Sequence, residues 1–379
     1  MKEKTALSRR ISTSSIFFFY GLCYSSWAAR IPSIQQNLHL SDAALGGVLF
    51  SMPIGSFLTL PFSGWLVAKV GSRKVVMFAA LIYIAMLVSI GFSQTVAQLV
   101  ISLFFFGSFG NMVNISINTQ AIGVEALYNK RILSSFHGVW STAGLGGAAI
   151  GTFVMGRGVG ASYHLLGIGI FALSTLIICT PYLLNADVNQ DKNMRVFVKP
   201  DKSLLVLGMI AFCSMMCQGA MFDWSGVYFK KVLLADKAWI GIGLTTFMVS
   251  MAAIRFIADW LTQHMGFRQI LQWSGLLSAA GLVISVSFPY LWPATIGFML
   301  VGIGVSPVVP LVFSEVGKSK TLSPGVAIAA VSTLGFVGLL IGPPLIGFVA
   351  GATSLKISFL ILAAIALLVS LLAFKVEEE

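Results

Sequence analysis

The sequence predicts an all-α integral membrane protein with twelve transmembrane helices, arranged as two six-helix bundles related by pseudo-two-fold symmetry. Of the 379 residues, 57% are hydrophobic and 10% are charged, and the mean hydropathy is +0.91. Soluble domains carry about 25% charged residues, so the bilayer is the natural solvent for this chain. Apolar windows long enough to cross a membrane recur along its whole length. The longest polar stretch divides them six and six.

Each span is expected where an apolar window of about 20 residues occurs. In the first half the windows are 12–34, 43–67, 74–94, 97–121, 132–158 and 161–185. In the second half they are 203–229, 236–262, 268–287, 289–315, 323–349 and 354–374. The basic N-terminus precedes the first span and does not read as a cleaved signal peptide. These windows predict an N-terminal bundle over 1–185, a cytoplasmic linker over 186–202 and a C-terminal bundle over 203–379.

The distribution of basic residues predicts the orientation. With both termini in the cytoplasm, 17 of the 24 lysines and arginines lie inside, six lie outside, and Arg255 falls within a span. Such an excess follows the positive-inside rule. It accounts for the net charge of +11, and because no basic face carries interleaved aromatic platforms, nucleic acid is not expected as a partner.

The two halves resemble each other. The stretch "STAGLGGAAIG" (141–151) aligns with "STLGFVGLLIG" (332–342) at an offset of 191, and "GWLVAKVGSRK" (64–74) aligns with "DWLTQHMGFRQ" (259–269) at an offset of 195. Two six-helix halves of the same topology predict a parallel repeat about an axis along the membrane normal. The segments "GIGVSPVVP" (302–310) and "GPPLIG" (342–347) predict kinks in spans ten and eleven.

Twelve spans with the turn at 64–74 resemble the Major Facilitator Superfamily, although that turn usually carries Asp where this chain has Ala68. The stretches "SSWAARIP" (25–32), "NISINTQAIGVE" (114–125), "SSFHGVWST" (134–142) and "QGAMFDWSGVYF" (218–229) resemble the YbjJ-type bacterial branch related to the fucose permease. That branch carries acids where this chain has Gln218 and Asn114. The resemblance implies a monomeric secondary transporter of the bacterial inner membrane that works by alternating access, without enzymatic activity or a cofactor.

Three asparagines in span four are the first candidate site. Asn111, Asn114 and Asn118 are spaced i, i+3 and i+7, so they share one helical face. An unpaired amide in hydrocarbon costs several kcal/mol, so this face meets either another helix or a wet cavity. The first alternative makes the asparagines interhelical hydrogen-bonding groups. The second makes them contacts for a polar solute, together with Gln218 and the indoles of Trp27 and Trp224.

Asp223 is an ionisable residue inside span seven, where charges are costly and usually functional. Arg30 lies at a similar depth in span one. One hypothesis pairs the two as a gate that closes the outer mouth. A second makes Asp223 a proton acceptor. In the third, Arg30 extends to the interface and Asp223 is hydrated near it.

Three further residues are candidates for proton coupling or gating. His137 lies near the cytoplasmic end of span five and titrates in the physiological range. Glu125 lies at the same end. Arg255 in span eight would attract an anionic substrate if it faced the cavity. For His137 and Arg255 a purely structural role is the competing interpretation.

The first functional hypothesis is therefore uptake of a small polar, sugar-like solute, with proton coupling left open. The alternatives are efflux of amphipathic compounds and a non-transporting membrane receptor. No catalytic residues, no metal ligands and no cofactor are predicted, because the chain has no Walker sequence and no Cys/His cluster with metal-ligand spacing. The lipid bilayer and the solute are the expected partners.

Overall fold

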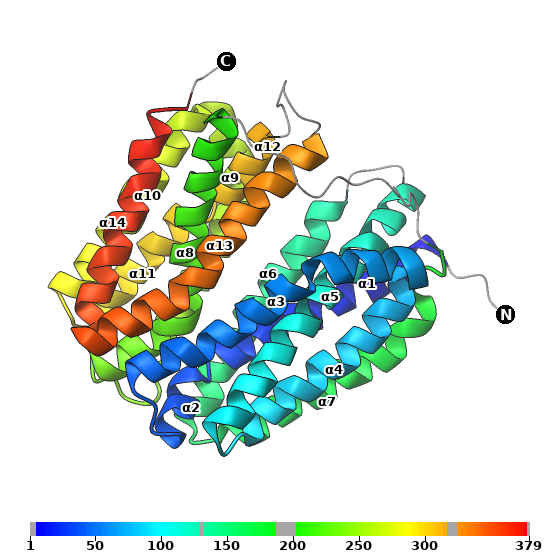
Figure 1. The fold of residues 1–379 in the computed structure, drawn as a ribbon, viewed down its shortest axis with the longest axis horizontal. Helices are drawn as coiled ribbons and strands as arrows, with labels where there is room; N and C mark the ends of the chain where they lie inside the picture. The colour runs from blue at the N-terminus through cyan, green and yellow to red at the C-terminus, as the bar shows by residue number, and fades with distance from the viewer. Residues whose placement is uncertain (1–4, 129–131, 187–201, 317–323, 377–379) are drawn as a thin grey trace. The chain divides into compact units, whose positions relative to one another are not determined.

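A computed structural model describes residues 5–128, 132–186, 202–316 and 324–376, and its regular structure over these residues is entirely helical (Figure 1). These residues divide into two compact units. The N-terminal unit lies within Met1–His39 and Val48–Lys192, and the C-terminal unit lies within Leu40–Gly47 and Asn193–Glu379. The predicted linker, 186–202, falls almost wholly on residues outside the described ranges.

The N-terminal unit is built from seven α-helices and one 3₁₀ helix in its described residues. They are α1 (Ala6–Ala28), α2 (Ile31–Asn37), most of α3 (Asp42–Val70), α4 (Ser72–Phe92), α5 (Val96–Tyr128), α6 (Leu133–Gly156), α7 (Ala161–Cys179) and η1 (Thr180–Tyr182). The division between the units falls inside α3, whose first residues cluster with the C-terminal unit.

The C-terminal unit contains seven further α-helices in its described residues. They are α8 (Lys202–Lys231), α9 (Ile242–His264), α10 (Phe267–Ser287), α11 (Leu291–Val305), α12 (Val308–Val316), α13 (Pro324–Ala352) and α14 (Leu355–Ala373). Each of the twelve predicted windows corresponds to one of these helices or to two consecutive ones. The chain is an all-α, multi-pass membrane protein.

Within the described residues, ten helices are long and apolar enough to cross a membrane. The two remaining windows are covered by α1 with α2, and by α9. Helix α1 is long, but it carries Arg9 and Arg10 near its start and several serines along its length. Helix α9 contributes a shorter apolar stretch, Ile242–Arg255.

Proline shapes two of the spans. Helix α1 ends at Ala28 and α2 starts at Ile31, because Pro32 has no N–H to donate to the Ala28 carbonyl and its ring would clash with that carbonyl. The predicted kink in span ten is a break, since α11 ends at Val305 and α12 begins at Val308. By contrast, α13 continues as one helix through the proline pair of "GPPLIG".

Helix packing repeats between the units. In the N-terminal unit, α1 packs on α6 and α7, and α4 packs on α5 and α7. The corresponding pairs in the C-terminal unit are α8 with α13 and α14, and α10 with α11 and α14. Figure 1 shows α8 and α13 side by side. The pairing is the same, so the internal repeat inferred from the sequence extends to the packing of each unit.

Close glycine contacts repeat with the same spacing. A Cβ at Gly107 would overlap the backbone carbonyl of Met52, and 195 residues later a Cβ at Gly302 would overlap the carbonyl of Phe247. These glycines allow α5 to approach α3 and α11 to approach α9 at backbone distance. The offset of 195 is the one found for the turn motif.

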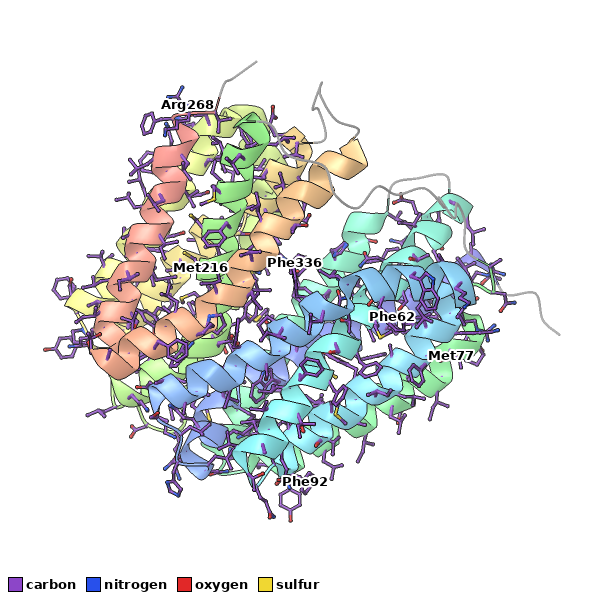
Figure 2. All side chains as sticks on the ribbon, viewed as in Figure 1. Phe62, Met77, Phe92, Met216, Arg268 and Phe336 are labelled. Atoms are coloured by element: carbon purple, nitrogen blue, oxygen red, sulfur yellow. The ribbon has the colours of Figure 1, made fainter. Side chains whose placement is uncertain are left out.

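Apolar side chains that are exposed on a water-soluble protein would favour aggregation, whereas here they meet lipid. Phe62, Phe92 and Phe153 are about half exposed or more, whereas Met216 is buried. Figure 2 shows Phe92 pointing away from the helices and Met216 lying among them. All four cysteines are buried free thiols, as their apolar context predicts.

Candidate functional site

The asparagine face of α5 separates into one residue that pairs with another helix and two that pair with each other. Asn111 is buried, and its Nδ2 donates to Oγ of Ser63 on α3 at 3.2 Å. Asn118 Nδ2 donates to both the carbonyl oxygen and Oδ1 of Asn114, at 2.8 and 3.0 Å. Asn114 and Asn118 are only partly buried. Among the described residues, neither Asn114 Nδ2 nor Asn118 Oδ1 has a hydrogen-bond partner, so both remain available to a ligand.

Gln120, two residues beyond Asn118, is fully buried and was not singled out from the sequence. Its Nε2 donates to Ser72 Oγ at 2.6 Å and to the Leu184 carbonyl at 3.1 Å, and its Oε1 accepts from the Leu184 N–H at 2.7 Å. Gln120 therefore ties the residues after η1 to α5 and to the start of α4. A satisfied buried amide of this kind is structural.

Aromatic rings of α1 and α4 lie beside Gly110, on the helix that carries the asparagines, and one ring of α6 adjoins the ring of α1. A Cβ at Gly110, one turn before Asn114, would lie 3.8 Å from the ring of Tyr20. The Tyr20 ring centroid is 6.4 Å from that of Trp140 on α6. The Trp140 indole N–H is buried and has no partner among the described residues. Sequence reasoning missed Tyr20 and Trp140, because the apolar pattern does not mark which aromatic residues lie near a polar helix.

A hollow of about 340 Å³ lies along α1 and α6 in the N-terminal unit. Its lining mixes apolar and polar groups: Leu7, Arg10, Ile11, Ser14, Ser15, Phe18 and Val139. The Arg10 guanidinium lies 5.4 Å from the centre of the Tyr128 ring and donates to Ser135 Oγ at 3.5 Å. The hollow combines one cation with apolar surface, a combination that suits amphipathic compounds.

Arg30, predicted as half of a gate, pairs within its own unit with a residue that the sequence analysis missed. It lies between α1 and α2 and is 1% exposed. Its Nε donates to Nδ1 of His164 on α7 at 2.9 Å. His164 is also buried. The predicted pairing of Arg30 with Asp223 would join residues of different units and stays a prediction.

The remaining candidates of the N-terminal unit lie at one end of α6. Glu125 accepts a hydrogen bond from the backbone N–H of Ile132 at 2.6 Å, directly before α6 begins. His137, in the second turn of α6, is exposed, and its ring meets the Phe17 ring edge-on at 5.5 Å. The hydrogen bond of Glu125 thus satisfies an amide next to the start of α6.

In the C-terminal unit, α8 carries three candidates with different environments. Trp224 is fully buried and its indole N–H donates to the Pro343 carbonyl of α13 at 3.2 Å. Gln218 is partly buried. Asp223 is 9% exposed, and no hydrogen bond or ion pair reaches its carboxyl group from the described residues. Such a carboxyl group is costly unless a proton, a cation or a solute satisfies it.

Two candidates remain, Trp27 and Arg255. Trp27, the second indole predicted to contact solute, is 1% exposed within the N-terminal unit. The partly buried Arg255 guanidinium on α9 lies against the sulfur of Met251, 3.8 Å away. A role for Trp27 in binding would require a change in its surroundings.

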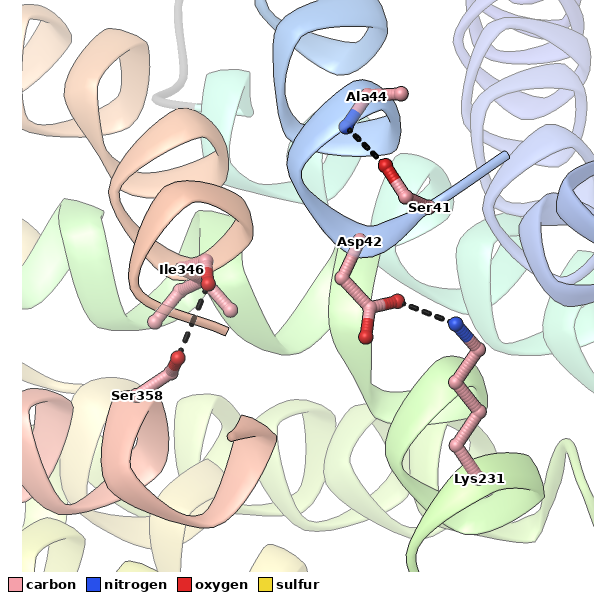
Figure 3. Close-up of polar contacts among 6 residues, drawn as sticks. All are labelled: Ser41, Asp42, Ala44, Lys231, Ile346 and Ser358. Carbon is pink, nitrogen blue, oxygen red and sulfur yellow. Dashed lines mark hydrogen bonds and ion pairs between the residues drawn. The ribbon is translucent and has the colours of Figure 1, made fainter. Parts of the chain in front are cut away.

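The first turns of α3 are held on the C-terminal unit by one ion pair and by close backbone packing. Lys231 Nζ at the end of α8 lies 2.6 Å from Asp42 Oδ1 (Figure 3). Gly46 meets Gly347 of α13, where a Cβ on either residue would lie within 3 Å of the other's backbone. The paired glycines let the two helices touch at backbone distance.

Two units of membrane-spanning helices with the same internal packing, and with a few polar groups set among apolar helices, define the fold of a secondary membrane transporter. The family model of the Major Facilitator Superfamily matches residues 13–314 and 204–379. The chain belongs to this superfamily. It is accordingly a transporter and not an enzyme.

Relatives of similar length support this assignment. An uncharacterized MFS-type transporter of Yersinia pestis is 31% identical over 353 residues, which cover 93% of this chain and 92% of the relative. The membrane protein MosC of Rhizobium meliloti is 29% identical over 358 residues, covering 93% and 86%. The crystal structure of the nucleoside transporter NupG superposes with a TM-score of 0.77 at 15% identity, covering 97% of this chain and 98% of NupG. The last likeness concerns the fold alone.

Proposed function

We propose that the protein is a secondary active transporter that moves a small polar, sugar-like solute across the bacterial inner membrane by alternating access. It works as a monomer with both termini in the cytoplasm, and it belongs to the YbjJ-type branch related to the fucose permease. The observation that carries the proposal is the pair Asn114 and Asn118. Both are partly buried and retain unused hydrogen-bonding capacity.

The chemistry of these residues favours an uncharged, hydroxylated solute. An amide offers both donors and an acceptor without a charge, so Asn114, Asn118 and Gln218 would complement sugar or polyol hydroxyl groups. The Tyr20 ring beside Gly110 adds an apolar surface for one face of the solute. Asn111, with its hydrogen bond to Ser63, positions α5.

Proton coupling would depend on Asp223 or His137, because amides replace two acids of related transporters at 114 and 218. Asp223 is the stronger candidate, since its carboxyl group is buried and no described residue is bonded to it. Addition of solute to de-energised vesicles should then move protons, and Asp223→Asn should abolish that signal. An unchanged proton flux in the variant would remove Asp223 from this role.

A thermal-shift screen tests the class of solute, because a ligand that binds only the folded protein raises its melting temperature. The panel contains sugars, polyols, nucleosides and inorganic anions. We expect a shift with a polyhydroxylated compound, and the loss of at least about tenfold in affinity in Asn118→Leu, which equals the loss of one good hydrogen bond. A shift confined to anions would contradict the proposed class.

Efflux of amphipathic compounds is a second candidate, favoured by the hollow on α1 and α6, where Arg10 adjoins Phe18 and other apolar side chains. A susceptibility panel in an efflux-deficient host separates the two functions. Efflux predicts resistance that Arg10→Gln weakens, whereas uptake of a polar solute predicts no change in susceptibility.

A further inference from the structure

The hydrogen bond between Arg30 and His164 joins two ionisable side chains that are both buried, 1% and 6% exposed. Arg30 lies at the junction of α1 and α2, and His164 lies in the first turn of α7. Arg30 Nε donates to His164 Nδ1 at 2.9 Å. The two residues are 134 positions apart in the chain, so the bond holds the α1–α2 junction to a distant helix.

This bond exists only while the imidazole is neutral. A guanidinium stays protonated in proteins and has donors but no acceptor. His164 Nδ1 must therefore provide a lone pair, which places the ring proton on Nε2. In the imidazolium form both ring nitrogens carry protons, so the acceptor is lost and a second positive charge stands beside the guanidinium.

The helices of the N-terminal unit that pack around the pair supply no negative charge to hold two cations together. Helices α1, α2, α4, α6 and α7 contain no Asp or Glu. On the side of α6 the imidazole faces Gly151. A Cβ on Gly151 would lie 3.5 Å from Cε1 of His164. Arg157, after α6, is exposed and lies over the Phe153 ring.

The other packed helices add no counter-charge either. The titratable groups of α1 that are nearest to Arg30 in the sequence, Tyr24 and Cys23, are uncharged at neutral pH at their ordinary pKa values. The charged residues of α4, Arg73 and Lys74, lie in its first turn, whereas Gly91 near its far end contacts α7.

Two further nitrogens of the Arg30–His164 pair lack hydrogen-bond partners in the part of the chain that the structure describes. Arg30 Nη2 and His164 Nε2 are buried and have no hydrogen-bond partner among the described residues. The guanidinium is thus held by a single bond to a side chain, and when that bond breaks, nothing in these helices replaces it. Buried charged groups are normally bonded more fully.

We propose that Arg30 and His164 form a proton-operated latch, in which uptake of one proton from water by His164 Nδ1 breaks the bond to Arg30 and releases the junction of α1 and α2. The Arg30 backbone transmits the release, because its carbonyl accepts from the amides of Ser33 and Ile34 and its N–H donates to the Trp27 carbonyl. The latch operates whatever the solute is. Its use as a coupling step in transport rests on the proposed function.

Hydrogen–deuterium exchange of the full-length protein in nanodiscs tests the latch without any solute. The measured segment is 29–38, and rates are corrected for the chemical pH dependence of exchange. Between about pH 8 and about pH 5.5, exchange in the wild type should rise by about tenfold, because about one pH unit below the ordinary histidine pKa of about 6.5 protonation favours the released imidazole about tenfold. In His164→Gln, whose amide oxygen accepts without titrating, exchange should not change with pH. The matched control His264→Gln, on α9 of the C-terminal unit, should behave as the wild type.

Wild-type protection that stays constant over this range would overturn the proposal, as would an equal acid-induced loss in His164→Gln. If His164→Gln does not fold, His39→Gln/His137→Gln/His264→Gln leaves His164 as the single histidine. Its imidazole ¹⁵N spectrum at about pH 8 should show the neutral ring with the proton on Nε2. A ring with its proton on Nδ1, or an imidazolium at that pH, overturns the latch. If exchange depends on pH as expected but solute drives no proton flux, the latch stands and only its use in transport is refuted.

Discussion

Replacing Gln120 by leucine removes three hydrogen bonds from a fully buried position and keeps the side-chain volume nearly constant. The N–H and carbonyl groups of Leu184 then lose the partners they have in α5. A buried donor left unpaired costs about 1–3 kcal/mol, and side-chain hydrogen bonds within membrane proteins average about 0.6 kcal/mol each. Together these values predict that Gln120→Leu lowers the free energy of unfolding by about 2–4 kcal/mol, which is about 30- to 800-fold in the folding equilibrium.

The assay is unfolding in mixed micelles, followed by tryptophan fluorescence. Gln98→Leu is the matched control on the same helix, because Gln98 is exposed and its Oε1 accepts from the backbone amides of Gln94 and Thr95 at 2.9 and 3.3 Å. That substitution should cost about 1 kcal/mol or less. Ligand affinity per folded molecule should be unchanged in both variants. Equal stability of Gln120→Leu and Gln98→Leu would refute the assignment of Gln120 as a structural anchor.

Three further substitutions test the packing. Gly107→Ala forces a Cβ against a carbonyl of α3 and should lower the free energy of unfolding by about 1–3 kcal/mol. The control Gly167→Ala, where a Cβ would meet nothing within 4 Å, should leave the melting temperature unchanged or raised. A lower stability of both variants would count against backbone contact as the cause. Trp224→Phe removes the hydrogen bond to the Pro343 carbonyl of α13 and should lower the free energy of unfolding by about 0.5–1.5 kcal/mol in the same micelle titration. An unchanged free energy would mean that this hydrogen bond does not stabilise the fold. Lys231→Gln breaks the ion pair with Asp42, whose two side chains are 39% and 18% exposed. The free energy of unfolding should therefore fall by less than about 1 kcal/mol, and by less still in about 1 M salt. A decrease that does not depend on salt would exclude an ion-pair origin.

The spans could be predicted from the sequence because crossing a bilayer requires long apolar helices, and hydropathy records this directly. The window 97–121 became α5 (Val96–Tyr128), and 268–287 became α10 (Phe267–Ser287). The first window was read as one span, yet it contains the junction between α1 and α2. The signal was present in "ARIPS" (29–33), since a proline inside a helix removes the hydrogen bond to the residue four positions earlier and interrupts the helix.

The polar pairs could not be predicted in this way. Asn111, Asn114 and Asn118 share a face by periodicity, but only the structure separates the one that bonds to Ser63 from the two that bond to each other. The pairing of Arg30 with His164 depends on tertiary packing, which local patterns do not encode. A lone histidine in an apolar window carries no local sign of its partner.

The most direct test of the central claim is solute counterflow in proteoliposomes, using the compound that the thermal-shift screen identifies. The wild type should exchange the solute. Asn118→Leu should lose at least about tenfold of the exchange rate at subsaturating solute while keeping its unfolding free energy within about 1 kcal/mol. Full exchange by Asn114→Leu/Asn118→Leu, or saturable binding by the wild type without any counterflow, would contradict the account.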